Sequence, residues 1–576
     1  MDLIRTLSYR HCDRLGRFGV NRHITDSSVA GIALDAANAS ADGSAFSDAT
    51  LGTLFHRSAT RHASRPALWV DGDSVSYGDL LSLGSRIART LIESGLGDGS
   101  ARCAVLGSRK LIDFTGIIGA SMARCAYVPL NARHPPRRLA QIMREAEAQA
   151  LVVGHDHLAQ ARAILEETPH SVLVLLPESS SAPNGAIGTH HRFLPQGDLA
   201  PPCLDAPPPG DPEDGAYLLF TSGSTGAPKG VLVRNRNVMP YLRSVAARYT
   251  PGADDRCTQL FDLTFDLSVH DMFVAWGAGA ALYRVPDNAR FAPRDFVRRH
   301  ALTMWFSVPS TAATMLGLRA LRPGDFPSLS LTLFCGEALP KRLARAWAAA
   351  APNAIIENLY GPTETTIALT AWRLPREENA LDALPEVLPI GKPLPGQAAV
   401  AVDATGALAR EDDEGELCLA GSQVTDGYWH RPDLTAQRFT RFPWDDRVWY
   451  RTGDRVRNSR NHGLVFLGRL DRQVKVAGHR VELQEVEAVL HRAADTNAAA
   501  IAWPIGPDGL ARGIVGFVGE TSLPDAALLQ ACRDALPPYA VPSAIRRIGD
   551  WPLNTSGKTD HGRLRAMMEA ETCSKT

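Results

Sequence analysis

The sequence predicts an α/β protein with largely parallel sheets, followed by a smaller α+β unit towards the C-terminal end. Short apolar runs alternate with amphipathic helical segments along most of the 576 residues, as strands alternate with crossover helices in such folds. Pro- and Gly-rich stretches at 177–215 and 381–396 interrupt the alternation and predict long connections. Because the chain is too long for one ordinary hydrophobic core, we expect two or three cooperating domains.

The apolar runs are short and bounded by turn residues, which favours buried strands. An amphipathic helix is expected from Arg137 to Glu147, and a β-rich subdomain with strands near Ala399 and Glu416 follows the second Pro- and Gly-rich stretch. Beyond Leu470, apolar residues share one face of each of two further helices. The buried strands are predicted at Cys103–Leu106, Ala150–Val153, Val172–Leu176, Tyr217–Phe220, Leu302–Val308, Leu331–Phe334 and Ala354–Ile356.

Composition argues against several classes of protein and partner. Hydrophobic residues make up 45%, charged residues 21%, and the net charge is -1, so nothing attracts nucleic acid or an anionic membrane surface. The nine cysteines are scattered without a CxxC pair, which disfavours a zinc site or a disulfide framework and favours a reducing cytoplasm. No apolar stretch is long enough to span a bilayer. Residues 1–47 form an extension to which the pattern assigns no role.

A loop rich in glycine and hydroxyl side chains directly follows the strand at Tyr217. Its glycines let the backbone approach an anion, and Lys229 adds a mobile positive charge. The glycine spacing is not that of a Walker loop, and Lys229 is followed by Gly230 and not by Ser or Thr, which disfavours a P-loop NTPase. The sequence therefore predicts a phosphate-binding loop with the residues Thr221-Ser222-Gly223-Ser224-Thr225-Gly226-Ala227-Pro228-Lys229-Gly230.

Two later segments suit a nucleotide that carries a metal ion. In the segment 358–366, Tyr360 offers a flat face to a purine, and Glu364 is a hard oxygen ligand of the kind that Mg²⁺ prefers. Thr363 and Thr365 can bond phosphate or substrate oxygens. In Tyr450-Arg451-Thr452-Gly453-Asp454, a carboxylate that accepts two hydrogen bonds suits a ribose diol.

In this order, the motifs resemble those of the adenylate-forming superfamily, which contains acyl-CoA synthetases, luciferases and the adenylation domains of nonribosomal peptide synthetases. The resemblance covers Leu51 to Leu564. It implies a large adenylation domain at 48–470, with two α/β subdomains and a β-rich subdomain, and a small mobile α+β lid domain at 471–576. The chain departs from the family pattern at Asn131, where Asp is usual, and at Ala477, where amino-acid-activating members often carry Arg.

The resemblance also assigns roles to individual residues. Lys558 would contact the substrate carboxylate and the departing pyrophosphate, Glu364 would bind Mg²⁺, and Thr221 would act with them in catalysis. Asp471 would be the hinge of the small domain, and the loop Gly478-His479-Arg480 would enter the site in the transfer state. The nucleotide-binding residues implied are Ser222, Gly223, Ser224, Thr225, Gly226, Lys229, Tyr360, Gly361, Thr363, Thr365, Asp454 and Arg469.

The segment Phe265-Asp266-Leu267-Ser268-Val269-His270 resembles the pocket motif of amino-acid-activating members. A carboxylate in an apolar pocket is costly unless a cation pairs with it, and the α-ammonium group of an amino acid is such a cation. The other pocket positions are mostly apolar and suit a small side chain; cysteine, serine, threonine, proline-like and other small amino acids remain open. They are Leu267, His270, Ser307, Leu333, Cys335, Leu359, Ile367 and Ala368.

The activity implied is activation of a small amino acid by ATP and Mg²⁺, followed by transfer to a phosphopantetheine thiol. Only 18 residues follow Lys558, whereas a carrier domain needs at least about 50 residues. We therefore expect a stand-alone adenylation domain that loads a separate carrier protein. An acyl- or aryl-CoA ligase of the same superfamily is the first alternative, and Asp266 argues against it. A non-catalytic nucleotide-binding protein is the second, which the intact Lys229, Glu364, Asp454 and Lys558 disfavour.

Overall fold

The computed structural model describes residues 46–182, 190–221, 228–290, 292–506, 509–554 and 558–573, without the side chains of 378, 379, 572 and 573. The chain divides into two compact units, Met1–Ala37 and Asn38–Thr576, and all of these residues belong to the second unit. The predicted N-terminal extension therefore lies outside the described residues as far as residue 45, and so does the segment 222–227 of the predicted phosphate loop.

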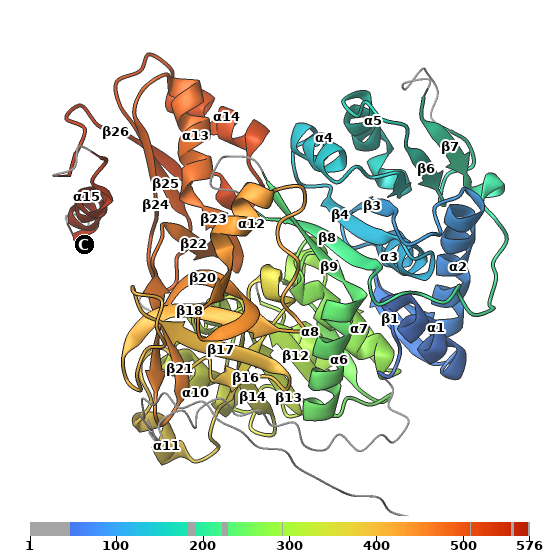
Figure 1. Cartoon of the computed structure of the whole chain (residues 1–576), viewed down its shortest axis with the longest axis horizontal. Coiled ribbons are helices and arrows are strands. Elements are labelled where there is room, and N and C mark those ends of the chain that lie inside the picture. The colour runs from blue at the N-terminus through green and yellow to red at the C-terminus, as the bar shows by residue number, and fades with distance from the viewer. Residues whose placement is uncertain are drawn as a thin grey trace, which may run out of the picture. The chain divides into compact units, whose positions relative to one another are not determined.

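A seven-stranded sheet in the order β7-β6-β5-β3-β4-β8-β9 is parallel except for the antiparallel pair β8 and β9 (Figure 1). Alternate residues of β3 point to opposite faces: Cys103 and Val105 pack with α2 and α3, and Ala104 and Leu106 pack with α4 and α5. Both faces are thus buried, which explains the continuous apolar runs of these strands. The strands are β3 (Arg102–Gly107), β4 (Ala126–Asn131), β5 (Ala150–Val153), β6 (Leu173–Leu176), β7 (Arg192–Pro195), β8 (Gly215–Thr221) and β9 (Lys229–Arg234).

A nine-stranded sheet in the order β16-β15-β14-β13-β12-β10-β11-β1-β2 has a parallel centre and antiparallel edges at β2, β15 and β16. In β12, Met304 and Phe306 pack towards α6 and α7, while Trp305 packs towards α9 and α10. The strands are β1 (Pro66–Val70), β2 (Asp73–Ser76), β10 (Arg256–Gln259), β11 (Ala281–Arg284), β12 (Met304–Ser307), β13 (Leu331–Phe334), β14 (Ile355–Tyr360), β15 (Thr370–Arg373) and β16 (Lys392–Pro393).

The predicted β-rich subdomain is a five-stranded antiparallel sheet. Its long strand β20 pairs with β18, β19 and β21, and this pairing carries Asp454 and Arg469 side by side on neighbouring strands. The strands are β17 (Gln397–Val402), β18 (Glu414–Gly421), β19 (Phe439–Phe442), β20 (Asp445–Ser459) and β21 (Gly463–Arg469).

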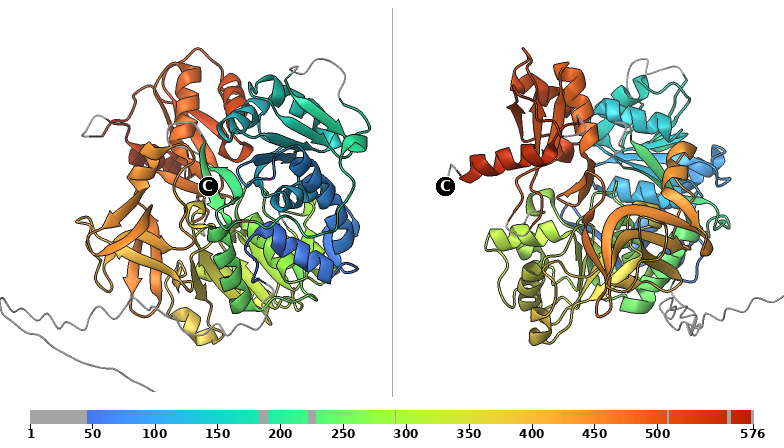
Figure 2. Two further views of the ribbon diagram at one scale, coloured as in Figure 1. Left: turned by 45° about the vertical axis from the view of Figure 1, so that its right-hand side comes forward. Right: turned by 60° about the vertical axis from the view of Figure 1, so that its left-hand side comes forward.

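The small C-terminal domain follows β21, and its described residues form a hairpin, a three-stranded sheet and three α-helices. Its helix α13 meets α4 of the large domain through a buried ion pair, with Arg138 Nη1 2.7 Å from Glu485 Oε1. Helix α15 lies at the outer edge of this domain, beside β24 (Figure 2). The strands are β22 (Gln473–Val476), β23 (His479–Glu482), β24 (Ala498–Ala502), β25 (Ile514–Val518) and β26 (Ala544–Arg547).

The helices among the described residues cover the sheets and are all too short or too polar to cross a membrane. They are α1 (Leu51–Arg61), α2 (Tyr77–Glu93), α3 (Leu111–Met122), α4 (Pro136–Glu145), α5 (Leu158–Glu166), α6 (Asn235–Tyr249), α7 (Leu267–Gly277), α8 (Arg294–Arg299), α9 (Pro309–Gly317), α10 (Lys341–Ala350), α11 (Glu378–Asp382), α12 (Pro432–Arg438), α13 (Leu483–Ala494), α14 (Asp525–Ala535) and α15 (His561–Cys573).

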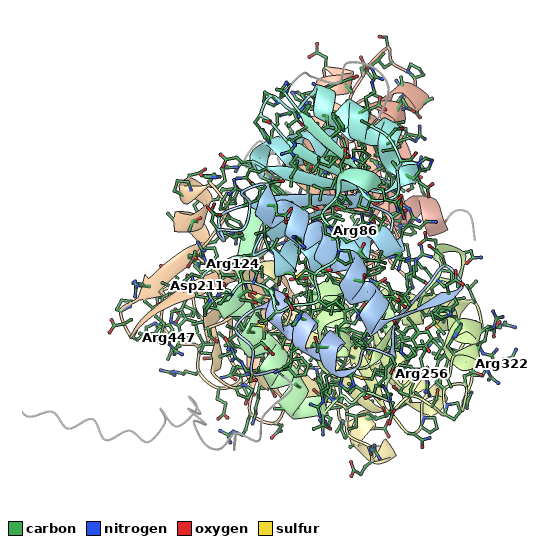
Figure 3. All side chains as sticks on the ribbon, turned by 90° about the vertical axis from the view of Figure 1, so that its right-hand side faces the viewer. Arg86, Arg124, Asp211, Arg256, Arg322 and Arg447 are labelled. Atoms are coloured by element: carbon green, nitrogen blue, oxygen red, sulfur yellow. The ribbon has the colours of Figure 1, made fainter. Side chains whose placement is uncertain are left out.

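The buried carboxylate of Asp214 fixes the start of β8. Because Thr221 is the last residue of this strand, the same contact helps to determine where Thr221 lies. Asp214 accepts hydrogen bonds from Arg124 Nε at 2.8 Å and from the backbone N–H of Asp211 at 2.9 Å. Arg124 and Asp211 lie close together on the face of the molecule that Figure 3 shows. Seven residues of strand then lead from Gly215 to Thr221 at the site.

Candidate active site

A cavity of about 100 Å³ lies where several strands of the two large sheets end, and the hairpin β22–β23 closes one side of it. Asn131, Thr221 and Tyr360 line it from the carboxyl ends of β4, β8 and β14. Ligands of α/β proteins bind at this edge of a sheet because the loops there are free to vary. Lys475 and Arg480 line the cavity from the small domain, so the site is built from both domains.

Asp266, predicted to bind an α-ammonium group, lines this cavity just before α7. Its carboxylate accepts a hydrogen bond from the backbone N–H of Ile367 at 3.2 Å, and the side chain is 6% exposed. Burial raises the pKa of Asp266 to about 7, and a hydrogen bond from the Thr363 side chain acts in the opposite direction. An ionised Asp266 is therefore costly until a cation reaches it.

The other predicted pocket residues do not all gather at Asp266. Leu267 and Cys335 line the same cavity. Ser307 lines a second cavity of about 80 Å³, and His270 and Leu333 line a third of about 10 Å³. His270 is bonded through Nδ1 to the Tyr241 hydroxyl at 2.7 Å, which holds the ring within the core. The last three positions are buried in the adjoining core, although the backbone N–H of one of them, Ile367, reaches the Asp266 carboxylate: Leu359, Ile367 and Ala368.

Glu364, the predicted metal ligand, is fully buried and surrounded by cations. Arg480 Nη1 donates to its two oxygens at 3.0 and 3.2 Å, and Lys229 Nζ lies 3.8 Å away. The Tyr428 hydroxyl donates a third hydrogen bond at 2.7 Å. Burial alone would raise the pKa of Glu364, but Arg480 and Lys229 outweigh it and hold the pKa at about 2. Glu364 is thus a carboxylate at neutral pH and a suitable Mg²⁺ ligand once Arg480 withdraws.

Lys229 is itself buried against this group. Its ammonium lies 4.8 Å from the centre of the Tyr428 ring and 4.0 Å from Glu482 Oε1. Burial and the nearby Arg480 lower the pKa of Lys229, Glu364 and Glu482 oppose this shift, and the resulting pKa is about 8. The cation is positioned at the end of the predicted phosphate loop, of which residues 222–227 lie outside the described part of the chain.

Asp454, the predicted ribose ligand, is 4% exposed beside the cavity. It accepts hydrogen bonds from the Tyr360 hydroxyl and from Arg469 Nη1, the latter at 2.5 Å. Arg469 also donates from Nε to Asp471 at 2.6 Å. The structure therefore links the predicted purine, ribose and hinge residues in one chain of hydrogen bonds, and Gly361 and Thr363 line the cavity beside them. Thr365 is buried next to it and donates to the carbonyl of Pro362 at 3.1 Å.

Lys558 stands apart from this cavity. It is exposed, lies shortly before α15, and its backbone N–H donates to Asn554 Oδ1 at 3.0 Å. The lysine that lines the cavity is Lys475, whose Nζ lies 5.8 Å from the centre of the Tyr360 ring. Burial lowers the pKa of Lys475, and Asp454 and Cys335 oppose that shift. Sequence reasoning did not single out Lys475, since its position in an alternating strand has no distinguishing local signal.

The site as a whole can hold a nucleotide against Tyr360 and Asp454, with a cation-binding carboxylate at Glu364 and a second, desolvated carboxylate at Asp266. It is the kind of site in which an acid and a nucleotide are brought together. Comparison with known proteins agrees: the profile of the family "AMP-binding enzyme" matches residues 55–429. The chain belongs to this family of adenylate-forming enzymes.

Several individual proteins and solved structures are similar to this chain over most of its length. The L-proline–[L-prolyl-carrier protein] ligase of Streptomyces coelicolor is 34% identical over 517 residues, which are 88% of this chain and 94% of that protein. Novobiocin biosynthesis protein H of Streptomyces niveus is 32% identical, over 90% of this chain and 82% of that protein. Among solved structures, the Vibrio cholerae adenylation domain AlmE, in complex with glycyl-adenosine-5'-phosphate, has a TM-score of 0.81 at 31% identity and covers 90% of this chain and 97% of its own.

Proposed function

We propose that this enzyme activates a small amino acid as its aminoacyl-AMP and then transfers the aminoacyl group to the phosphopantetheine thiol of a separate carrier protein. The observation that carries the proposal is Asp266: a desolvated carboxylate in the same cavity as Tyr360 and Asp454 provides a place for an α-ammonium group next to a nucleotide. Relatives named as an amino acid–carrier protein ligase and as a glycyl-adenylate complex support the same reaction class.

In the first step, a carboxylate oxygen of the amino acid attacks the α-phosphorus of ATP, and pyrophosphate leaves. Asp266 orients the amino acid, Tyr360 and Asp454 orient the nucleoside, and Lys229 stabilises charge on the departing phosphates. We assign Mg²⁺ to Glu364, where it would neutralise phosphate charge. Lys558 would join this step after the small domain, 471–576, turns about Asp471 relative to the large domain, 48–470.

In the second step, the thiol sulfur attacks the acyl carbon of the adenylate, and AMP leaves. We propose that the structure has the arrangement of this step, because Lys475 and Arg480 line the cavity while Lys558 is outside it. A buried Lys475 would stabilise negative charge at the reacting acyl group and the departing AMP.

We assign a small side chain to the substrate because Leu267, Cys335 and Gly336 line the cavity beside Asp266. An ideal Cβ at Gly336 would approach Val308 Cγ1 to 3.2 Å, so this wall is closely packed. Glycine, cysteine, serine, threonine and proline-like amino acids all meet this description. We also assign the protein to the cytoplasm, where the seven described cysteines, all free thiols, would stay reduced.

The test of the proposed function is amino-acid-dependent exchange of labelled pyrophosphate into ATP, measured across small amino acids and their des-amino analogues. We expect a signal with one small amino acid and none with its des-amino analogue. Exchange only with acids that lack the amino group would instead establish the acyl- or aryl-CoA ligase alternative. The absence of pyrophosphate exchange with every acid tested would favour the alternative of a non-catalytic nucleotide-binding protein.

The pKa of Asp266 predicts how amino-acid binding depends on pH. The ammonium group pairs with the carboxylate form, which predominates above about pH 7 in the empty site. Below that value the KM for the amino acid should rise about tenfold for each pH unit, and above it the KM should level off. Steady-state exchange kinetics from pH 5.5 to 8.5 measure this, with Asp266→Asn as control. A wild-type KM that is flat across pH 7 would contradict the assignment.

Replacement of Lys475 should slow transfer to the thiol much more than it slows adenylation. We expect Lys475→Met to slow single-turnover transfer from the adenylate to the carrier thiol about 10- to 100-fold, since one preorganised donor near developing charge typically contributes that much or more. Pyrophosphate exchange should fall much less, and Lys475→Arg should retain part of the transfer rate. Equal losses in both steps would show that Lys475 does not act chiefly in transfer.

A further inference from the structure

Glu337 is a buried carboxylate that no step above uses. It lies in the connection between β13 and α10, and it is 8% exposed. Each of its oxygens accepts one backbone N–H: Oε2 from Ser310 at 2.7 Å, and Oε1 from Gly478 at 2.6 Å. Burial raises the pKa of Glu337, whereas these two hydrogen bonds, a further one from the Ser310 hydroxyl and the positive charge of Lys475 lower it.

The two donors come from different domains. Ser310 is the second residue of α9 in the large domain, so its hydrogen bond with Glu337 is retained when the small domain moves. Gly478 is in the turn of the β22–β23 hairpin of the small domain, and its hydrogen bond with Glu337 exists only while that hairpin is inserted. The contact therefore depends on the arrangement of the domains.

The turn fits closely against the large domain. Ala477 and Gly478 have φ of 49° and 82°, the left-handed values that a tight two-residue hairpin turn requires. A Cβ at position 478 would lie 2.4 Å from Val308 Cγ1, so only glycine permits this approach. On the two sides of the turn, Lys475 and Arg480 extend to the cavity. Fixing the turn therefore fixes both cations in the site.

We propose that Glu337 is a positioning residue that holds the hairpin turn at Gly478 in the site and thereby stabilises the arrangement used for transfer. The inference rests on the proposed function, because it adds a residue to the second step. Glu337 touches neither the thiol nor the adenylate, and it acts through the placement of Lys475 and Arg480.

Glutamine is the informative substitution, because it has the same shape but only one acceptor oxygen. The backbone N–H of Ser310 is always present, so the amide oxygen of the introduced side chain would pair with it and leave the amide NH₂ facing the N–H of Gly478. Two donors would then face each other in the inserted arrangement alone. Since hydrogen bonds to a charged group are among the stronger ones, we expect Glu337→Gln to weaken insertion about 10- to 100-fold.

The experiment compares Glu337→Gln with Ser310→Ala, which removes a hydroxyl that also hydrogen-bonds Glu337 within the large domain but keeps both backbone donors. Three quantities are measured on the full chain: the pyrophosphate exchange rate with its KM for the amino acid, the single-turnover rate of transfer to the carrier, and hydrogen–deuterium exchange of the peptides covering 473–482 and 309–317. In Glu337→Gln we expect slower transfer by about 10- to 100-fold, faster deuterium uptake in 473–482, and unchanged pyrophosphate exchange and 309–317 uptake. Ser310→Ala keeps the hydrogen bond with Gly478 and should therefore lose much less of the transfer rate than Glu337→Gln.

Two results would overturn the inference. One is wild-type transfer and wild-type uptake at 473–482 in Glu337→Gln. The other is equal loss of both half-reactions together with faster uptake at 309–317, which would make Glu337 a residue of general structure. A failure of the proposed function is distinguishable, because the wild-type enzyme would then show no pyrophosphate exchange, while the uptake comparison would still report whether Glu337 holds the turn.

Discussion

Replacing Lys558 with alanine should reduce pyrophosphate exchange by about 10²- to 10³-fold, the loss expected when one preorganised cation is removed from developing charge. The folded state should be unaffected, since Lys558 is exposed. Transfer from a preformed adenylate should stay within a few-fold of the wild-type rate, because Lys475 and not Lys558 lines the cavity in this arrangement.

The matched comparison is Lys475→Met, for which the opposite pattern is expected. Quenched-flow measurements of adenylate formation and of thioester formation, made on both variants, check the pair of predictions. Normal adenylate formation by Lys558→Ala would remove Lys558 from the mechanism. It would also remove the reason for supposing that the small domain turns between the two steps.

Replacing Asp266 with alanine should raise the KM for the amino acid by about 10²- to 10³-fold, because a buried ammonium group would lose the carboxylate that pairs with it. The KM for ATP should change little, since Tyr360 and Asp454 remain. Substrate-saturation curves of pyrophosphate exchange measure both constants. Unchanged kinetics with the amino acid would refute the pairing of Asp266 with an ammonium group.

Asp266→Asn provides the structural control for this prediction. In the empty site Asp266 is desolvated and has a raised pKa, so its charge does not stabilise the fold at neutral pH. Asparagine can keep a neutral hydrogen-bonding group there. We expect the thermal unfolding midpoint of Asp266→Asn to equal or exceed that of the wild type at pH 8, although the variant binds the amino acid poorly.

The sequence predicts the central parallel strands well, because both of their faces are buried. The predicted strands Ala150–Val153 and Leu331–Phe334 coincide with β5 and β13. The strand predicted at Ala354–Ile356 begins one residue later and runs on to Tyr360 as β14. Its continuation was missed because Glu357 and Asn358 are polar, although both are buried and hydrogen-bonded.

The ends of elements and the antiparallel edges were harder to predict. The helix expected at Arg137–Glu147 ends at Glu145, and Glu147 has a φ of 48°, which a right-handed helix cannot contain. Strand β9 begins at Lys229, within the segment predicted to be a loop, because it pairs with β8 across a connection that local sequence does not reveal. Pairing of this kind depends on tertiary contacts.

For the site, ordered motifs predicted more than single positions did. Tyr360 ends β14, Asp266 directly precedes α7 and Asp454 lies within β20, and all three line one cavity. His270 was assigned to the pocket by position, but its hydrogen bond with Tyr241 directs it into the core. The roles proposed for Lys475 and Glu337 depend on how the hairpin and the large domain meet, which no local pattern encodes.

In the function proposed above, one enzyme both adenylates an amino acid and loads it onto a carrier protein. Intact-protein mass spectrometry of a separate phosphopantetheinylated carrier protein, incubated with the enzyme, ATP, Mg²⁺ and the amino acid found by pyrophosphate exchange, tests it most directly. We expect a mass increase equal to one aminoacyl group, absent without ATP and absent for Asp266→Ala at the same amino-acid concentration. An unmodified carrier, together with acylation of free CoA by an acid that lacks an amino group, would contradict it.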